Sequence, residues 1–351
     1  MVETIARRDI RKLSLEELKA FFVQHGDKAF RAQQVYDWLW KKSAKDFDQM
    51  TNLSLATREL LKSHFIINFV RVDNMQRSAD GTIKNAVKLH DGLIVESVLI
   101  PTEKRITACV SSQVGCSLTC RFCATARLKR MRNLNPDEIY DQVAAIQQQC
   151  ELFFGRPLTN IVFMGMGEPL LNYANVMAAI EKITSPKGLN MASKRLTVST
   201  VGIAKMITKM ADDGAKFNLA VSLHSALDHV RSSIMPINET NSLQELGGAL
   251  EYWYKNTKRK VTYEYVVWQG INDTADHAQA LLKFCKLVPC KVNLIEYNPI
   301  GDGEFRQASV DALNMYMDLL ESNGITTRIR KSRGKDIDAA CGQLANKSVD
   351  N

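Results

Sequence analysis

The run Cys116-Ser-Leu-Thr-Cys120-Arg-Phe-Cys123 places three cysteines within eight residues, directly after the β-branched segment 106–110. A closed structural zinc site takes four ligands, so three thiolates leave one position of a metal centre to be filled from elsewhere. An iron–sulfur cluster held by three cysteines keeps one iron open, and an open iron can chelate a small molecule. The spacing therefore indicates a metal centre. The alternative is a zinc site whose fourth ligand is Cys109 or His224.

Around this motif, short apolar segments alternate with amphipathic ones from about residue 105 to residue 330. Strands separated by helices of about 10–15 residues argue for β-α units around a parallel sheet, with the working groups at the carboxyl ends of the strands. Six or seven strands suit a complete or partial barrel, although periodicity alone also allows a doubly wound sheet. The expected strands are 106–110, 160–167, 195–200, 216–224, 261–270, 291–298 and 325–330, and the expected helices begin near Pro136, Ala174, Gly202, Ser242, Thr274 and Ser309.

The chain before residue 105 has a different pattern of apolar and polar residues. Three amphipathic runs, 14–26, 30–42 and 53–65, predict a small helical unit, and Ser14 and Gly26 give the first run its start and stop signals. From 73 to 101 the pattern alternates, and Asp80-Gly81 and Asp91-Gly92 predict the turns of hairpins. We expect four units, namely a helical RNA-binding accessory domain over 1–72, a β-hairpin connector over 73–101, a core barrel over 102–335 and a C-terminal segment over 336–351.

Composition narrows the class of protein. The 351 residues carry a formal net charge of +8, which is compatible with a polyanionic partner such as nucleic acid. Clustered cysteines in a reducing cytosol are more often metal ligands or catalysts than disulfides. No apolar run approaches the roughly 18 residues that a membrane span needs, and the charged opening 1–13 is unlike a signal peptide. We therefore expect a cytoplasmic protein that does not enter a membrane.

Polar side chains recur where the expected strands end. Gly167 and Glu168 lie in the run GMGEPLLN, in which a strand turns into a helix with Pro169 in its first turn. Ser199, the Ser222-Leu223-His224 run and Asn298 lie at or just beyond the ends of three further strands. Each of these polar groups taken alone is as well explained as a helix cap or a turn residue. Together they give the carboxyl edge of the sheet a set of short hydrogen-bonding groups.

The C-x3-C-x2-C motif with an aromatic residue before its last cysteine resembles the signature of the radical S-adenosylmethionine enzymes. The resemblance implies a partial (β/α)6 barrel and one [4Fe-4S] cluster held by Cys116, Cys120 and Cys123. S-adenosylmethionine would bind the open iron and be cleaved to a 5′-deoxyadenosyl radical. The cofactor contacts that the resemblance implies are Gly167, Glu168, Ser199, Ser222, Leu223, His224 and Asn298.

Two isolated cysteines narrow the resemblance. Cys109 lies on the first expected strand, and Cys341 lies near the C-terminus in the run RKSRGKDIDAACGQL, whose cations favour a thiolate. The run CVSSQVGC, which begins with Cys109, and the run that contains Cys341 are both similar to runs in the RlmN-type methyltransferases. That resemblance implies methylation of C2 of adenine 2503 in 23S ribosomal RNA and of adenine 37 in some transfer RNAs. The other isolated cysteines, Cys150, Cys285 and Cys290, are expected to be small buried apolar residues.

The resemblance also implies a reaction course. Two molecules of S-adenosylmethionine are consumed for each methylation. Cys341 first takes a methyl group from one of them, and its methylene radical then adds to the adenine and forms a covalent RNA–protein adduct. Cys109 resolves the adduct and leaves a transient disulfide with Cys341. Glu96 matches a position that has been proposed as a proton acceptor in the family. The alternative is a strand glutamate that faces solvent or pairs with a nearby lysine.

Two other interpretations remain open at this point. A Cfr-type relative uses the same cysteines but methylates C8 of adenine, and Pro169 after Glu168 favours the C2 enzymes over it. A non-catalytic RNA-binding protein with zinc at the three clustered cysteines would leave Cys109 and Cys341 unexplained.

The expected partners are 23S rRNA, tRNA and a flavodoxin-type electron donor, and the expected state is a monomer. RNA contacts are expected from the helical domain, from 129–132 and from 331–335, whereas 255–260 is expected to be a solvated helix end.

Overall fold

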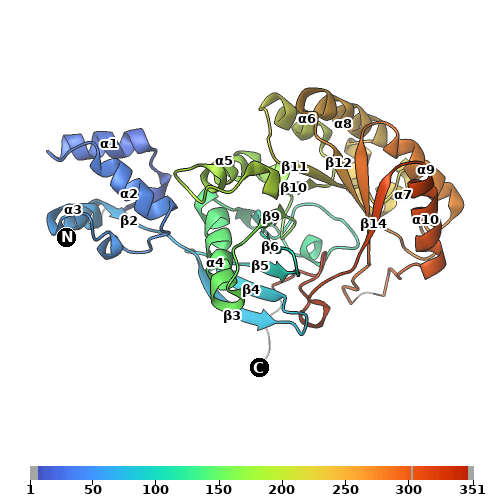
Figure 1. Ribbon diagram of the computed structural model, residues 1–351, viewed down its shortest axis with the longest axis horizontal. Coiled ribbons are helices and arrows are strands. Elements are labelled where there is room, and N and C mark those ends of the chain that lie inside the picture. Colours follow the sequence, from blue (N-terminus) through green and yellow to red (C-terminus); the bar gives the residue numbers. More distant parts are fainter. Residues whose placement is uncertain (1–6, 302, 347–351) are drawn as a thin grey trace.

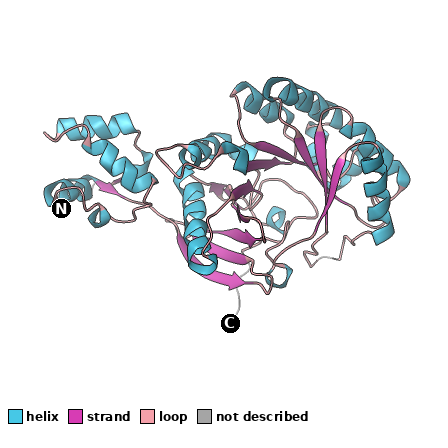
Figure 2. Cartoon of the chain, in the orientation of Figure 1, coloured by secondary structure: helices cyan, strands magenta, loops and turns pink. Residues whose placement is uncertain are grey.

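The computed structural model describes residues 7–301 and 303–346. Its core is a ten-stranded sheet in the order β14-β13-β12-β11-β10-β9-β6-β5-β4-β3. Helices cover the outside of this curved sheet (Figures 1 and 2). The alternating part comprises β6 (Ile106–Cys109), α4 (Pro136–Phe154), β9 (Asn160–Phe163), α5 (Tyr173–Thr184), β10 (Leu196–Thr200), α6 (Ala204–Asp212), β11 (Asn218–Ser222), α8 (Leu243–Thr257), β12 (Val261–Val266), α9 (Ala275–Cys285), β13 (Cys290–Ile295), α10 (Val310–Ser322) and β14 (Thr326–Arg330).

Consecutive strands of the alternating part are neighbours, and all their pairings are parallel. A doubly wound sheet reverses its strand order part-way, so this order excludes that alternative. Within the described residues β14 pairs only with β13, so the barrel is partial. The expected strands and helices are confirmed. One further helix, α7 (Asp228–Ile234), was not expected because seven mostly polar residues show no apolar period.

The strands have an apolar face toward the helices and a polar face toward the inside, so the barrel has a polar interior. In β10, Leu196 and Val198 are buried against the helices, while Thr197 and Ser199 face the inside. The same alternation continues in β12, where Thr262 and Glu264 line the interior. An interior lined by polar groups leaves room for a ligand instead of a packed core.

The segment 73–101 forms part of the same sheet. β3 (Arg71–Arg77), β4 (Ile83–Lys88) and β5 (Ile94–Pro101) are joined by the two expected turns and pair antiparallel. β5 then pairs antiparallel with β6, with Val98 opposite Cys109. The hairpins were expected as a connector between domains; the structure shows that they extend the barrel sheet, because β5 has buried residues on both faces.

The N-terminal helices form a separate lobe beside α4 and α5 (Figure 1). The expected helices are confirmed as α1 (Leu15–Gln24), α2 (Arg31–Trp40) and α3 (Leu55–His64), and Ser14 forms a capping box with Glu17. Residues 1–6 and 347–351 of the expected domains lie outside the described residues. The remaining short elements are β1 (Arg8–Asp9), η1 (Ile10–Lys12), η2 (Phe47–Gln49), β2 (Phe65–Ile66), β7 (Gln113–Val114), η3 (Ala124–Arg127), β8 (Arg132–Asn133), η4 (Pro169–Asn172), η5 (Ser193–Arg195), η6 (Pro236–Thr240) and η7 (Lys335–Ile337).

A buried ion pair joins this lobe to the barrel. The Arg11 guanidinium donates to both carboxylate oxygens of Asp141 on α4, at 2.7 and 2.8 Å, and to the carbonyl of Asp137. The same guanidinium lies over the Trp40 ring, 4.8 Å from its centroid. The lobe is therefore fixed to the helix that follows the cysteine motif. Among the described helices, none combines the length and apolarity needed to cross a membrane.

Candidate active site

A cavity of about 940 Å³ occupies the inside of the partial barrel. Its lining includes the three clustered cysteines together with Cys109 and Cys341. All five thiols are free, so no disulfide joins Cys109 to Cys341 in this structure. The fold thus brings five cysteines from both ends of the barrel sequence to one cavity, and Cys109 and Cys341 share it as the resemblance implies.

The cysteine motif forms a loop between β7 and η3 over the carboxyl ends of the strands. Burial raises the pKa of the Cys116 thiol to about 11, and the neighbouring Cys123 and Glu168 charges raise it further. Burial likewise raises the pKa of Cys120 and Cys123. A bound cation would favour the thiolate forms that bind a metal. The donor set of the loop, three cysteines within eight residues, fits a metal cluster.

The geometry differs from that of a single-ion site. Among the described residues, no three His, Cys, Asp or Glu side chains converge to hold one metal ion. A cluster needs no such convergence, because each thiolate binds a different iron. The zinc alternative, with Cys109 or His224 as the fourth ligand, therefore finds no formed single-ion site among the described residues.

The glycines of the run GMGEPLLN allow a close approach between two segments. A Cβ on Gly165 would lie 2.7 Å from the carbonyl of Val110, and one on Gly167, at φ +92°, would lie 2.5 Å from the Cβ of Gln113. Gln113 in turn accepts a hydrogen bond from the backbone N–H of Glu168 at 2.9 Å. The motif is therefore packed directly against the strand that leads into the cysteine loop.

The Glu168 carboxylate is buried and lines the cavity. It accepts hydrogen bonds from the backbone N–H groups of Leu170 and Val201, at 3.0 and 2.9 Å. Burial raises its pKa to about 7, although these hydrogen bonds act in the opposite direction. Glu168 is thus the cap of η4 as well as a carboxylate placed to receive a cationic group from a ligand.

His224 is held as a neutral ring. Its Nδ1 accepts a hydrogen bond from the backbone N–H of Val266 at 3.1 Å, which leaves the proton on Nε2. Burial lowers the pKa of His224 to about 3, and the nearby Arg231 charge lowers it further. The ring packs edge to face with Phe122 of the cysteine motif, with centroids 4.7 Å apart. His224 thereby contributes one N–H donor and an aromatic wall.

The other expected cofactor contacts fall into two groups. Ser199, Ser222 and Asn298 line the cavity at the ends of their strands. Leu223 does not line it, because its side chain is buried in the apolar core. The Oδ1 atom of Asn298 is buried without a hydrogen-bond partner, which is the signature of an acceptor that awaits a ligand.

Arg330 and Glu264 are site residues that the sequence did not single out as a pair. The Arg330 guanidinium lies 3.6 Å from the Glu264 carboxylate and interacts electrostatically with both Cys341 and Cys109. Burial raises the pKa of the Cys109 thiol to about 12, against the influence of Arg330. The alternation of inward residues along β12 and β14 is the sequence signal that could have found them.

Two other cations near Cys341 form ion pairs with carboxylates. Lys335 pairs with Glu296 at 2.5 Å, and Arg333 pairs with Asp80 at 3.9 Å. Arg330 interacts electrostatically with both thiols, and Lys331 lines the same cavity. Two cations of the expected basic run are therefore committed to carboxylates outside the thiol pair.

The segment that carries Cys341 is tied to the cysteine loop. The backbone N–H of Ala124 donates to the Gly342 carbonyl at 2.7 Å, and the Thr125 hydroxyl donates to the Leu344 carbonyl at 2.6 Å. Asn298 donates to the carbonyl of Cys341 itself at 3.2 Å. Cys341 is exposed to the cavity at the tip of this segment.

Glu96 anchors the end of the same segment. Its carboxylate accepts hydrogen bonds from the backbone N–H groups of Ala345 and Asn346, at 2.8 and 3.2 Å, and lies 3.5 Å from the Lys84 ammonium. Glu96 is buried and is absent from the cavity lining. A solvent-facing Glu96 is thereby excluded, and the pairing with a lysine is confirmed.

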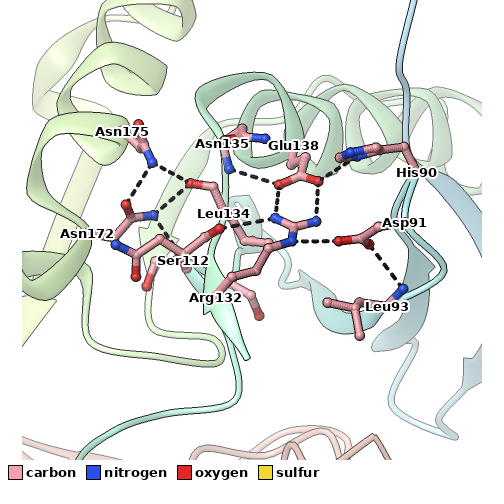
Figure 3. Close-up of polar contacts among 12 residues, drawn as sticks. His90, Asp91, Leu93, Ser112, Arg132, Leu134, Asn135, Glu138, Asn172 and Asn175 are labelled. Atoms are coloured by element: carbon pink, nitrogen blue, oxygen red, sulfur yellow. Dashed lines mark hydrogen bonds and ion pairs between the residues drawn. The ribbon is translucent and has the colours of Figure 1, made fainter. Parts of the chain in front are cut away.

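Arg132 is also committed to a structural contact. Figure 3 shows its guanidinium bonded to both oxygens of the buried Glu138 carboxylate, each at 2.7 Å, and to Asp91. Asn172 of η4 donates to the carbonyls of Ser112 and Leu134 in the same view. Arg132, expected to contact RNA, instead fixes the segment after the cysteine loop to α4.

Comparisons with known proteins agree with this site. A family model described as "Ribosomal RNA large subunit methyltransferase N-terminal domain" matches residues 8–67, and one described as "Radical SAM superfamily" matches residues 110–285. A Christiangramia forsetii protein named "Probable dual-specificity RNA methyltransferase RlmN" is 69% identical, over 98% of this chain and 97% of its own length. The chain belongs to the RlmN family. It is a radical S-adenosylmethionine methyltransferase, and its family implies an iron–sulfur cluster and S-adenosylmethionine.

More distant relatives cover the chain equally well. A Salinibacter ruber protein with the same name is 42% identical, over 98% of this chain and 95% of its own length. A solved radical SAM methyltransferase from Sphaerobacter thermophilus superposes with a TM-score of 0.90 at 38% identity, covering 96% of this chain and 99% of that one. The RlmN-family fold is thus shared from the N-terminal lobe to the segment that carries Cys341.

Proposed function

We propose that the protein methylates C2 of an adenine in 23S ribosomal RNA and in some transfer RNAs, with Cys341 as the carrier of the methyl group. The observation that carries this proposal is the convergence of Cys109 and Cys341 on the cavity that the three clustered cysteines line. A methyltransferase that only moved a methyl group from a sulfonium to a nucleophile would need neither isolated cysteine. Carbon 2 of adenine has no lone pair, so it requires the radical route.

Cys116, Cys120 and Cys123 would hold one [4Fe-4S] cluster, and Glu168, His224, Ser199, Ser222 and Asn298 would contact S-adenosylmethionine. Bound together, these two groups supply the removal of a hydrogen atom from an otherwise unreactive methyl group. The buried Glu168 carboxylate is suited to the amino group of the methionine moiety. The unpartnered Asn298 Oδ1 is suited to a donor on the adenosine moiety.

Cys341 would act first as a nucleophile. The Arg330 guanidinium interacts electrostatically with its sulfur, and attack on a sulfonium methyl group needs a thiolate as the nucleophile. The carbonyl of Cys341 is held by Asn298, which keeps the loop in place while the sulfur changes its substituent. The sulfur would later bear the carbon that bonds to the adenine.

Cys109 would act last. Its raised pKa keeps it a thiol while Cys341 is alkylated, because it is buried in β6. As a protonated thiol it does not compete for the methyl group. Before Cys109 acts, the adduct would lose the C2 proton and return one electron to the cofactor site. The Cys109 thiolate would then attack the sulfur of Cys341, the S–C bond to the RNA would break, and its carbon would take up a proton and become the methyl group. An external thiol would reduce the disulfide that remains. Glu96 would hold the C-terminal segment in register for these steps, and a proton-accepting role would require it to leave Ala345 and Asn346.

The proposal is tested by anaerobic turnover of the cluster-loaded protein with an RNA fragment and methyl-labelled S-adenosylmethionine. The modified nucleoside is identified by mass spectrometry against authentic standards. We expect 2-methyladenosine. Formation of 8-methyladenosine would keep the mechanism and replace the assigned carbon, as in the Cfr-type relatives.

Cysteine variants separate the steps. Cys341→Ala is expected to yield no methylated RNA and no labelled protein. Cys109→Ala is expected to accumulate a covalent RNA–protein adduct, visible as a shifted band after denaturation. Cys150→Ala is the matched control, since Cys150 is buried in α4 and does not line the cavity. Normal turnover by Cys341→Ala would refute the carrier role.

The proposed partners are 23S rRNA, transfer RNA and a flavodoxin-type electron donor. The protein is proposed to work as a monomer in the cytoplasm, where eight free cysteines are compatible with the reducing conditions.

A further inference from the structure

Six cations line the cavity toward the amino ends of the barrel strands, with Arg328, the third of the five residues of β14, lying deepest along its strand. Arg105 directly precedes β6, Lys260 directly precedes β12, and Lys291 is the second residue of β13. Because the strands are parallel, their amino ends share one edge of the sheet, opposite the cysteine loop (Figure 1). We call this set the amino-end rim; it comprises Arg105, Lys258, Arg259, Lys260, Lys291 and Arg328.

The described carboxylates of the chain form no ion pairs with the cations of the amino-end rim. No ion pair involves any of its six members within residues 7–301 and 303–346, and all but Arg259 are exposed. Three acidic side chains line the same cavity. Glu264 pairs with Arg330, Glu296 pairs with Lys335, and Glu168 accepts backbone hydrogen bonds. The sequence predicted that 255–260 is a solvated helix end and turn, and the end of α8 at Thr257 with exposed Lys258 and Lys260 confirms this; Lys258, Arg259 and Lys260 also line the cavity.

The opposite end of the cavity, at the carboxyl ends of the strands, holds the expected cofactor site. The cysteine loop and the segment 339–346 cover it and are hydrogen-bonded to each other. The groups that would contact the cofactor, such as Glu168 and His224, also lie at the carboxyl ends of the strands. The cysteine loop and the segment 339–346 therefore leave little room for RNA at that end, and the exposed cations at the other end mark the side that we assign to it.

The distances suit one extruded nucleotide. Strand residues advance by about 3.3 Å, so Arg328 lies about 7 Å along β14 from Arg330, which interacts with Cys341. By the same measure Arg105 lies about 13 Å from Cys109. Enzymes that modify a base extrude it into the active site and leave its flanking phosphates outside.

We propose that the amino-end rim binds the phosphates on either side of the target adenosine, so that RNA delivers its base to Cys341 through the amino ends of the strands. This inference rests on the proposed function. Lys and Arg position a nucleic-acid backbone without reading its sequence, which suits an enzyme that must accept more than one RNA. The rim thereby sets which way the RNA lies across the barrel.

The test compares two triple variants of the cluster-loaded protein. Lys260→Gln/Lys291→Gln/Arg328→Gln removes three charges from the rim. Lys205→Gln/Lys283→Gln/Lys286→Gln removes three charges from exposed positions on and after the outer helices α6 and α9. The affinity for an RNA fragment containing the target is measured by fluorescence anisotropy from 50 to 300 mM salt. Iron content and circular dichroism confirm that both variants are folded.

The rim variant is expected to bind RNA at least about tenfold more weakly at low salt, with a slope of log affinity against log salt reduced by about 2. The control variant is expected to match the unmodified protein. Equal affinity and slope in both variants would overturn the rim inference and leave the proposed function standing, provided that the unmodified protein still forms 2-methyladenosine.

Two further outcomes are distinguishable. Unmodified protein that binds RNA but forms no methylated adenine would refute the proposed function, not the rim. A rim variant with normal RNA affinity but slow reduction by an acidic electron-carrier protein would overturn the inference and assign the rim to that partner.

Discussion

His224 shows how one buried side chain sets a pH dependence. Its pKa is lowered to about 3 from an ordinary 6.5, mainly by burial. Below pH 6.5 the unfolded chain binds a proton that the folded chain does not bind. The free energy of unfolding therefore falls by up to about 1.4 kcal/mol per pH unit as the pH falls from about 6.5 toward 3.

His224→Gln is expected to flatten this dependence, because glutamine has no charged form. The measurement is the urea midpoint between pH 4.5 and pH 7. His229→Gln is the control, since His229 is exposed on α7. A steep acid dependence that survives in His224→Gln would show that another group carries it.

Gly167 combines a left-handed backbone with a contact that excludes a side chain. At φ +92° a Cβ would meet the Cβ and backbone N of Gln113, at 2.5 and 2.9 Å. Gly167→Ala is expected to destabilise the fold by about 2–4 kcal/mol and to lower the iron content, because the cysteine loop begins beside Gln113. Thermal unfolding and iron analysis measure both effects.

Gly248→Ala provides the matched comparison. Gly248 lies in α8 with nothing near its missing Cβ, so alanine is expected to raise stability by up to about 1 kcal/mol. Equal effects of the two substitutions would mean that Gly167 tolerates a side chain and that the motif is not held by close packing.

At the scale of elements, α4 connects the metal loop to the rest of the barrel. Its first turns present Glu138 to Arg132, while Gln142 hydrogen-bonds to the backbone of Ser111, at 2.8 and 3.2 Å. Both contacts flank the cysteine loop on its two sides (Figure 3 shows the Arg132 side). A helix that holds both ends of a loop limits how far its thiols can separate when no cluster is bound.

Arg132→Met is expected to leave the buried Glu138 carboxylate with only its contacts to the Asn135 N–H and the His90 ring, at a cost of about 3 kcal/mol. It should also lower the iron retained after gel filtration, because the loop loses one of its fixed ends. Arg130→Met is the control, since Arg130 is exposed and makes only a 3.4 Å contact with Asn133. Unchanged iron retention in Arg132→Met would assign the pair to global stability alone.

At the scale of the whole molecule, Arg11 and Asp141 fix the N-terminal lobe. Their side chains are 3% and 11% exposed, so removing one partner leaves the other charge buried without a counter-ion. Arg11→Leu is expected to cost about 3–5 kcal/mol, and Arg11→Leu/Asp141→Leu much less, because it removes both charges. The urea midpoint measures these changes.

Arg8→Leu is the control for this interface. Arg8 lies 3.6 Å from Glu17 with both side chains more than half exposed, so its loss is expected to cost less than about 1 kcal/mol. A double variant no more stable than Arg11→Leu would show that packing over Trp40, and not charge pairing, holds the lobe.

The sequence determined the strands and helices of the barrel, because buried strands and amphipathic helices have local patterns that need no tertiary information. It also predicted that the three clustered cysteines lie together, since eight residues cannot separate them far. The polar positions Ser199, Ser222, His224 and Asn298 were predictable for a related reason. Parallel strands place their carboxyl ends on one edge, so residues at those ends share a cavity.

Only the tertiary structure decided which charges are available. The runs around Arg132 and Lys335 are both basic in sequence, but Asp91 and Glu296, far along the chain, pair with Arg132 and Lys335. The Arg330–Glu264 pair and the Glu96 anchor of the C-terminal segment are likewise contacts between distant segments. Local sequence patterns indicate burial and backbone preference. The partner of a charged side chain depends on which distant segments the tertiary fold brings beside it.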